Sequence, residues 1–235
     1  MRLQFTHIIN KHRNVPAICI GHSPSLDIYK SELIKRKELG HILIDCNEWM
    51  QFNNPEPNYW VVANNIITVN NWFTEINKHN CTFVYADSVD LTPQPLVERL
   101  LECNYVSFDQ RHFNNKSCDC CQTYGCQQSV LPNRLTIQEE LKKYCGVVYH
   151  YSTGHSIIVH MLALAVLLGC NPIHYVGVDL SYSKGYAQNS TNLIQTVNLS
   201  DLDNSKNIIL QDIDIIAKSA ENVGVEIVNL FPGGI

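Results

Sequence analysis

Three groups of residues place glycine or polar side chains directly after a short apolar run. In the first, the run Ala17–Ile20 leads into the turn Gly21–Ser25, with the sequence GHSPS, and then into a helical pattern. A glycine there lets a ligand approach the backbone closely, Ser23 or Ser25 can cap the helix, and free N–H groups at a helix start attract phosphate. The turn therefore predicts a nucleotide phosphate site, although many α/β turns hold the same residue types for their geometry alone.

The second group follows the apolar run Ile173–Val176, where Asp179 lies three residues beyond the run. Open α/β sheets bind their ligands at the carboxyl ends of the strands. A carboxylate at this place can hold a ribose hydroxyl, a metal ion or an acceptor hydroxyl. Alternatively, Asp179 caps a turn.

The third group repeats this arrangement after further apolar runs. Asp45 and Asn47 end one run, Asn64 follows the next, and Asp87 follows the one after that. Amide side chains at such positions can read the edge of a base or a sugar without adding charge. Each position alone is weak evidence, but their recurrence after successive strands predicts a shared cleft.

Apolar runs of strand length alternate with segments of helical spacing along the chain. The predicted strands are Ala17–Ile20, Ile42–Ile44, Tyr59–Ala63, Thr82–Tyr85, Ile173–Val176 and Glu226–Val228. The predicted helices are Leu26–Leu39, Asn70–Lys78, Pro95–Glu102, Thr136–Tyr144, His155–Leu168 and Ile208–Val223. This alternation predicts an α/β fold with a doubly wound, mainly parallel, Rossmann-like sheet and helices on both faces. The helix at His155–Leu168 is apolar almost all round, so we expect it to be buried.

Composition narrows the class of protein. With 235 residues and 45% hydrophobic residues the chain can form one domain, residues 1–235, with its own core. A net charge of −5 argues against nucleic acid as a partner. No apolar stretch reaches the length of a membrane span, and the N-terminal residues lack a signal-peptide pattern. We therefore expect a cytoplasmic protein without a membrane span.

The ten cysteines divide into two groups. Six lie in or beside apolar runs and are expected to be reduced core residues: Cys19, Cys46, Cys81, Cys103, Cys145 and Cys170. The other four are Cys118, Cys120, Cys121 and Cys126, in a loop-like excursion at about 113–134. They could hold a structural Zn²⁺ ion, alone or with His112, but a local disulfide or free thiols in a loop are the alternatives.

Two motifs resemble those of a known superfamily. Gly21-His22-Ser23-Pro24-Ser25-Leu26 is similar to its Gly-x-Gly-Pro-Ser-Leu loop, and Gly177-Val178-Asp179-Leu180-Ser181-Tyr182 is similar to its Gly-x-Asp-Leu-x-Tyr motif. Thr153-Gly154-His155-Ser156 resembles the Ser/Thr-Gly-x-x helix start between them. The superfamily contains archaeal 6-hydroxymethyl-dihydropterin diphosphokinases, bacterial motility accessory factors, and the CMP-sialic-acid-dependent sialyltransferases of glycosyltransferase family 42. The resemblance implies a nucleotide-binding transferase.

The diphosphokinase-like branch fits best at the sequence level, because Asn229-Leu230-Phe231-Pro232-Gly233 also looks like its Asn-Leu-Ser-Pro-Gly ending. The expected reaction is then transfer of diphosphate from ATP to a small hydroxylated acceptor, with Mg²⁺ held by Asp179 and by Asp45 or Asp87. One alternative is glycosyl transfer from a CMP-linked nonulosonate donor to a small-molecule or glycan acceptor, which requires no metal. Another is a protein that binds a nucleotide or sugar nucleotide without turnover.

Two departures from the family pattern concern catalysis. His22 and Ser23 stand where the family has Asn or Ala and then Gly, so phosphate must be approached past a side chain. The sialyltransferase branch has a histidine general base shortly before its final helix, and the corresponding stretch 203–206 contains none. The relatives assemble into oligomers, and a homo-oligomer could use the candidate interface aromatics Trp49, Trp60 and Trp72.

The expected site combines these groups. The candidate catalytic residues are Asp179, His155 as a general base or a core residue, and Tyr182 and Tyr186, which fall near tyrosines that help the leaving phosphate in the sialyltransferase branch. The expected nucleotide-binding residues are Gly21, His22, Ser23, Pro24, Ser25, Asp45, Asn47, Asn64, Asp87, Thr153 and Gly154.

Overall fold

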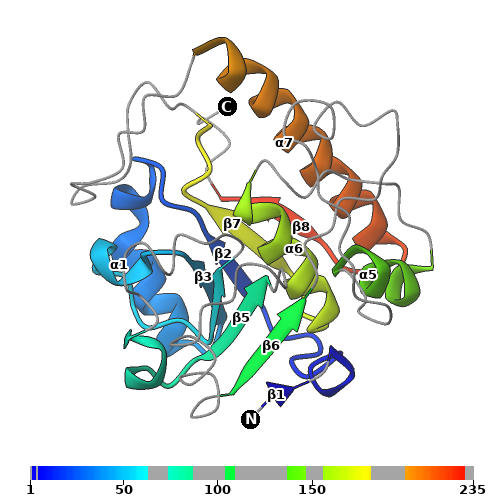
Figure 1. Cartoon of the computed structure of the whole chain (residues 1–235), viewed down its shortest axis with the longest axis horizontal. Coiled ribbons are helices and arrows are strands. Elements are labelled where there is room, and N and C mark those ends of the chain that lie inside the picture. Colours follow the sequence, from blue (N-terminus) through cyan, green and yellow to red (C-terminus); the bar gives the residue numbers. More distant parts are fainter. Residues whose placement is uncertain are drawn as a thin grey trace.

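The computed structural model describes residues 2–3, 5–62, 74–86, 104–108, 137–146, 156–180 and 199–230. Within these residues a single eight-stranded sheet runs through the molecule in the order β1-β6-β5-β4-β3-β2-β7-β8 (Figure 1). Every neighbouring pair in that order is parallel. The strands are β1 (Arg2–Leu3), β2 (Ala17–Ile20), β3 (Ile42–Cys46), β4 (Tyr59–Val62), β5 (Thr82–Ala86), β6 (Tyr105–Phe108), β7 (Ile173–Val176) and β8 (Ile227–Asn229).

The six strands predicted from apolar runs are all present, and β2 and β7 have the predicted bounds. β1 and β6 were not predicted. β1 has only two residues, and β6 has the sequence YVSF, whose serine interrupts any apolar run. Both strands are stabilised by pairing. Arg2 and Leu3 of β1 align with Tyr105 and Val106 of β6, and β6 also pairs with β5. The prediction of a parallel α/β sheet is confirmed.

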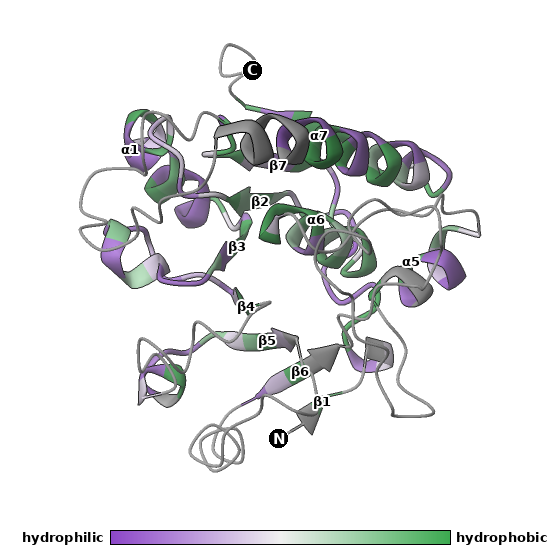
Figure 2. Cartoon of the chain, turned by 45° about the horizontal axis from the view of Figure 1, so that its top comes forward, coloured by the Kyte–Doolittle hydropathy of each residue, from purple (hydrophilic) through white to green (hydrophobic). Residues whose placement is uncertain are grey.

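Helices cover both faces of this sheet, as the alternation of side chains along β2 shows. Ala17 and Cys19 pack on the face that carries α5 (Ile137–Cys145), α6 (Ile157–Leu167) and α7 (Leu199–Glu221). Ile18 and Ile20 point to the other face. There they pack with Leu26 and Leu33 of α1 (Leu26–Glu38). Figure 2 shows α1 and α6 on opposite sides of β2 and β3.

α6 is the central helix of the larger core, as its apolar sequence predicted. All its residues from Ile158 to Leu167 are buried. Ser156 caps its start by accepting a hydrogen bond from the Ile158 amide. The helix ends at Gly169 as predicted, where the Gly169 amide donates to Val166 O and the Cys170 amide to Ala165 O, the pattern of a Schellman motif.

The last helix is longer than predicted. Helical spacing indicated Ile208–Val223, whereas α7 begins at Leu199. Its first turns contain Ser, Asp and Asn, which have low intrinsic helix propensity, so the sequence pattern hid them. The stretch 203–206 is therefore part of the helix, and the sequence that precedes the helix, 181–198, also contains no histidine.

Two other predicted helices fall largely outside the described residues. Of Asn70–Lys78, residues 74–78 are described, and only Ile76–Lys78 (η4) forms a short 3-10 helix. Pro95–Glu102, the Cys-rich excursion at about 113–134 and its four candidate zinc ligands lie outside the described part of the chain. Among the helices that are described, none combines the length and the apolar character needed to cross a membrane.

Burial corrects one expectation about tryptophan and supports another about cysteine. Trp49, in the 3-10 helix η2 (Trp49–Phe52), and Trp60 are 5% and 0% exposed. They pack edge to face in a cluster with Phe83, so they belong to the core and are not available to an interface. Trp72 lies outside the described residues. Five of the six predicted core cysteines are free and buried, and Cys103 is not described.

Candidate functional site

The candidate site lies where the winding of the sheet reverses. β2 has β3 on one side and β7 on the other (Figure 1). From β3 the strands continue in chain order to β6 on one side, whereas β7 leads to β8 on the other. The order of the strands thus reverses at β2 and β7, and open α/β sheets bind their ligands at the carboxyl ends of the strands at such a point.

Two glycines let these loops touch backbone to backbone. Gly21 follows β2 and Gly177 follows β7. A Cβ atom on Gly21 would lie 2.3 Å from the carbonyl oxygen of Gly177, and one on Gly177 would lie 2.1 Å from that of Gly21. Gly177 also has a φ of +69°, a conformation that L side chains rarely adopt. The Ser23 amide donates to Gly177 O at 3.0 Å and ties the loops together.

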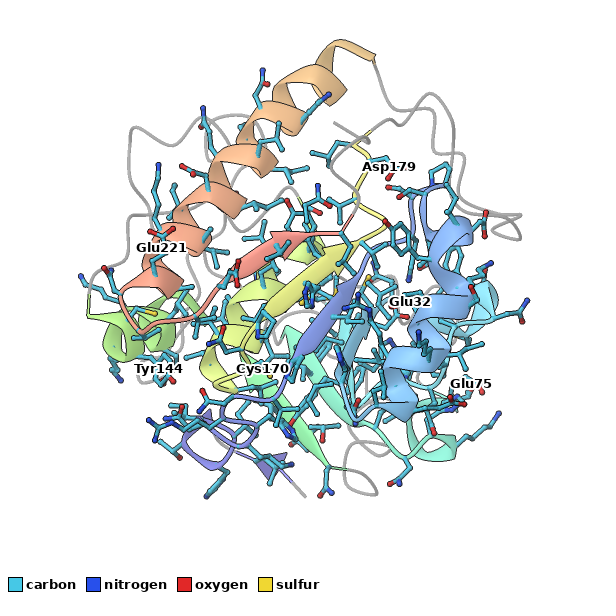
Figure 3. The ribbon with its side chains drawn as sticks, turned by 180° about the vertical axis from the view of Figure 1, so that it is seen from behind. Glu32, Glu75, Tyr144, Cys170, Asp179 and Glu221 are labelled. Carbon is cyan, nitrogen blue, oxygen red and sulfur yellow. The ribbon has the colours of Figure 1, made fainter. Side chains whose placement is uncertain are left out.

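Asp179 connects the β7 loop to the start of α1. Its Oδ2 accepts a hydrogen bond of 2.9 Å from the Ser25 amide. Its Oδ1 accepts a second hydrogen bond from the Ser25 hydroxyl. Figure 3 shows Asp179 beside the end of α1 from which these donors come. A carboxylate is favourable at a helix N-terminus, because the first amides carry partial positive charge.

Capping of α1 thus differs from the expectation. Neither serine caps the helix with its own side chain as the sequence suggested, since Ser25 makes no such bond and its hydroxyl donates to Asp179 instead. The following amides also have protein acceptors: those of Leu26, Asp27 and Ile28 donate to the carbonyls of Ser23, Pro24 and Ser25. The free N–H groups that were expected to attract phosphate are therefore engaged within the protein at these four positions.

A second polar cluster lies beside this turn on the α1 face. His22 Nε2 lies 2.8 Å from Asp45 Oδ1, and both residues are buried. Asp45 Oδ1 also accepts from the Cys46 amide at 2.7 Å, and Oδ2 accepts from Asn54 Nδ2 at 2.9 Å. The His22 ring stacks on Phe52 with ring centroids 4.0 Å apart. Both oxygens of a fully buried carboxylate are thus satisfied, as burial of a charge requires.

Three side chains of this cluster also lie close enough together to be considered as ligands of one metal ion. One ligand atom each of His22, Asp45 and Cys46 lies within 4.8 Å of the others. Burial and the nearby Asp45 and Glu48 raise the pKa of the Cys46 thiol well above its usual range, which opposes the thiolate that a metal would need. Its Sγ instead lies 3.7 Å from Ile20 O, to which it donates. The contacts therefore form a hydrogen-bond network rather than a ligand set.

Glu48 sits 3% exposed next to this network, and burial raises its pKa above the ordinary 4.5, more than His22 lowers it. The folded state therefore favours the protonated carboxyl. Its contribution to stability is present below pH 4.5 and is lost as pH rises through the raised pKa. We expect Glu48→Gln to remove this loss, so that the variant gains stability over the parent in urea unfolding as pH rises above 4.5.

Glu75→Gln is the matched control. A hydrogen bond from Lys78 lowers the pKa of Glu75, so its contribution is lost as pH falls and the pH dependence has the opposite sign. Both pairs of unfolding curves should be measured at the same pH values. Equal pH dependence in the Glu48→Gln variant and the parent would show that Glu48 is not desolvated in the folded protein.

The structure brings part of the predicted site together in two groups. Gly21, Ser25 and Asp179 meet at the α1 start, and His22 meets Asp45 behind it. Ser23 and Pro24 complete the turn through their backbone. Asn47 follows β3 with a φ of 43°, and its carbonyl accepts from Trp60 Nε1. Its Oδ1 is buried and has no hydrogen-bond partner among the described residues.

The other candidates lie outside the described residues and stay predictions. They are Asn64, Asp87, Thr153, Gly154, His155, Tyr182 and Tyr186. Sequence reasoning missed Gly177 as the partner of Gly21, and it missed Asn54 and Phe52, which hold Asp45 and His22. Gly177 had a signal, since it follows its strand as Gly21 does. Asn54 and Phe52 had none, because only folding brings them to β3.

No protein-family model matches the chain, and no curated protein matches it. Among solved structures it is similar to the sialyltransferase CstII from Campylobacter jejuni in complex with a substrate analogue, cytidine-5′-monophosphate. The TM-score is 0.51 at 13% identity, over 94% of this chain and 82% of that one. A MAf glycosyltransferase from Magnetospirillum magneticum AMB-1 aligns with a TM-score of 0.47 at 12% identity, over 94% of this chain and 35% of that one. The chain therefore has a sialyltransferase-like fold.

Proposed function

We propose that this protein is a glycosyltransferase that takes a nonulosonic acid, a sialic-acid-type sugar, from a CMP-linked donor. The observation that carries the proposal is the likeness to a sialyltransferase in complex with cytidine-5′-monophosphate, which extends over 94% of this chain and 82% of the other. A match that nearly spans both chains supports a shared overall architecture, including the edge of the sheet at which such folds bind ligands. The acceptor is a hydroxyl of a small molecule or glycan.

The backbone at the carboxyl ends of β2 and β7 favours nucleotide binding there. Gly21 and Gly177 have no Cβ atom, so the two backbones meet directly. Asn47 follows the neighbouring strand β3 with a buried Oδ1 that has no partner within the described part of the chain. A buried acceptor without a partner is costly, so a hydroxyl or amino group of a bound nucleotide would satisfy it.

Three carboxylates are expected to hold Mg²⁺. Asp87 lies outside the described residues, and the contacts of the other two favour the metal-free reaction. Asp179 accepts from the Ser25 amide and hydroxyl. Asp45 accepts from His22, Asn54 and the Cys46 amide. Both oxygens of each carboxylate thus already accept hydrogen bonds from protein donors, and Mg²⁺ bound there would compete with these donors. These contacts fit glycosyl transfer better than diphosphate transfer from ATP, for which Mg²⁺ is essential.

Diphosphate transfer remains the second candidate, because the Asn-Leu-x-Pro-Gly ending resembles that branch. Residues 229 and 230 lie beside the site: the Leu230 amide donates to Tyr175 O, and Leu230 O accepts from the Tyr29 hydroxyl. The remaining residues of the motif, 231–233, lie outside the described part of the chain. A protein that binds the nucleotide without turnover is the third candidate.

Donor turnover distinguishes the three candidates. The purified protein is incubated with CMP-N-acetylneuraminate in EDTA, and separately with ATP, Mg²⁺ and a panel of hydroxylated acceptors. We expect release of CMP that EDTA does not reduce, and no conversion of ATP to AMP. Release of AMP that requires Mg²⁺ would contradict glycosyl transfer and support the diphosphokinase. Binding of CMP without turnover of either donor would support the binding protein.

A further inference from the structure

The pair formed by His22 and Asp45 has no role in the proposed binding of the nucleotide. Its side chains are 5% and 0% exposed, and the distance between Nε2 and Oδ1 is 2.8 Å. Asp45 is in turn fixed by Asn54 Nδ2 and by the Cys46 amide. A histidine oriented by a carboxylate that is itself held in place is the arrangement of a general base and its orienting group.

We propose that His22 is the general base of the transfer reaction and that Asp45 is its positioning residue. In the step, His22 takes the proton of the acceptor hydroxyl while the acceptor oxygen forms a bond to the anomeric carbon of the donor sugar. The bond between that carbon and the phosphate oxygen of CMP breaks, and its electron pair leaves on the phosphate. The proposal rests on the proposed function.

The contact with Asp45 determines which ring nitrogen can accept the proton. An ionised carboxylate only accepts hydrogen bonds, so His22 Nε2 carries the hydrogen and donates it. Neutral imidazole has one hydrogen, and Nδ1 therefore keeps its lone pair. When Nδ1 takes up the acceptor proton, the resulting imidazolium is stabilised by the Asp45 charge.

The surroundings of the ring favour this role. His22 directly follows Gly21, at the carboxyl end of the strand where the winding reverses. Phe52 stacks on the ring and limits its rotation. The titratable groups that face it from β3 and the following turn are Asp45, Cys46 and Glu48. A fixed and largely desolvated base requires little reorganisation when the proton moves.

The stretch before the last helix offers no histidine as a base. Residues 181–206, from the end of the β7 loop into α7, contain no histidine. His155 lies outside the described residues and is the rival candidate. His22 replaces the Asn or Ala of the family loop, so a new base at this position would compensate for the histidine that is absent before the last helix.

The test is CMP release from CMP-N-acetylneuraminate with water as the acceptor, which needs no knowledge of the natural acceptor. We expect His22→Gln to lower kcat about 10²–10⁴-fold. The Kd for CMP, from calorimetry, should change less than about threefold, because the lost interaction is made only with the acceptor.

Two further variants make the result specific. His12→Gln is the matched control: His12 Nε2 bonds the Tyr59 hydroxyl at 2.9 Å, away from the site, and kcat should stay close to that of the parent. Asp45→Asn keeps an acceptor for His22, because Asn54 can turn its Oδ1, which has no hydrogen-bond partner among the described residues, toward the new amide. It removes only the charge that stabilises the imidazolium, so we expect a loss of about 10–100-fold.

The outcomes separate the two proposals. Turnover in the parent with less than about threefold loss in folded His22→Gln would overturn the base and leave the glycosyltransferase standing. A large loss in His155→Gln together with an unaffected His22→Gln would have the same meaning and assign the base to His155. No CMP release from the donor by the parent protein would overturn both proposals.

Discussion

Gly177→Ala is expected to lower the free energy of unfolding by about 2–5 kcal/mol. Two costs add at this position. The new Cβ would lie 2.1 Å from the backbone oxygen of Gly21, which belongs to a buried loop and cannot move aside like the end of a side chain. The φ of +69° adds the cost of a left-handed conformation. Urea unfolding followed by circular dichroism measures the change.

Gly224→Ala separates the two costs. Gly224 has nearly the same φ, +72°, but a Cβ there meets no atom within 4 Å. The Gly224→Ala variant should lose only the free energy of unfolding that the left-handed conformation costs, about 1–2 kcal/mol. If the two variants lost the same stability, the close approach of the β2 and β7 loops would be wrong.

Asp179→Ala is expected to lower the free energy of unfolding by about 2–3 kcal/mol. The substitution removes both hydrogen bonds to Ser25, one from its amide and one from its hydroxyl. It therefore uncaps α1 and frees the β7 loop from the helix at the same time. Urea unfolding gives the loss of stability, and Asp179→Asn, which keeps one acceptor oxygen, should lose less.

Asp27→Ala is the matched control for charge at the same helix end. Asp27 lies in the first turn of α1 and pairs with Lys30 at 2.6 Å, with both side chains about a quarter exposed. A pair of this kind contributes about 0–1 kcal/mol. Equal losses in Asp27→Ala and Asp179→Ala would mean that Asp179 acts only through the helix dipole and does not join the two loops.

The sequence predicts most of the fold because the fold follows from local patterns. Four-residue apolar runs such as Ala17–Ile20 and Ile173–Val176 can only be buried strands once helices flank them on both sides. Of the two strands that were missed, β1 is stabilised by pairing with β6, with Leu3 opposite Val106, and β6 pairs with β5 as well. The pairing of β1 joins residues more than a hundred positions apart and leaves no local signal, and the serine of β6 interrupts its apolar run.

The candidate site was predicted only in part for the same reason. Asp179 and the Gly21–Ser25 turn were singled out separately, but their contact joins residues 154 positions apart. Likewise the sequence predicts Asp45 at the end of its strand, as a possible Mg²⁺ ligand. Its place within β3 and its contact with His22 follow from the register of β2 against β3, which the sequence does not state.

Calorimetric titration of CMP into the protein in EDTA is the most direct test that the nucleotide of a CMP-linked donor binds at the carboxyl ends of β2 and β7. We expect saturable binding at one site per chain, unaffected by Mg²⁺, and weakened in Gly177→Ala under conditions where that variant is still folded. No binding of CMP, or binding of ATP with Mg²⁺ in its place, would contradict it.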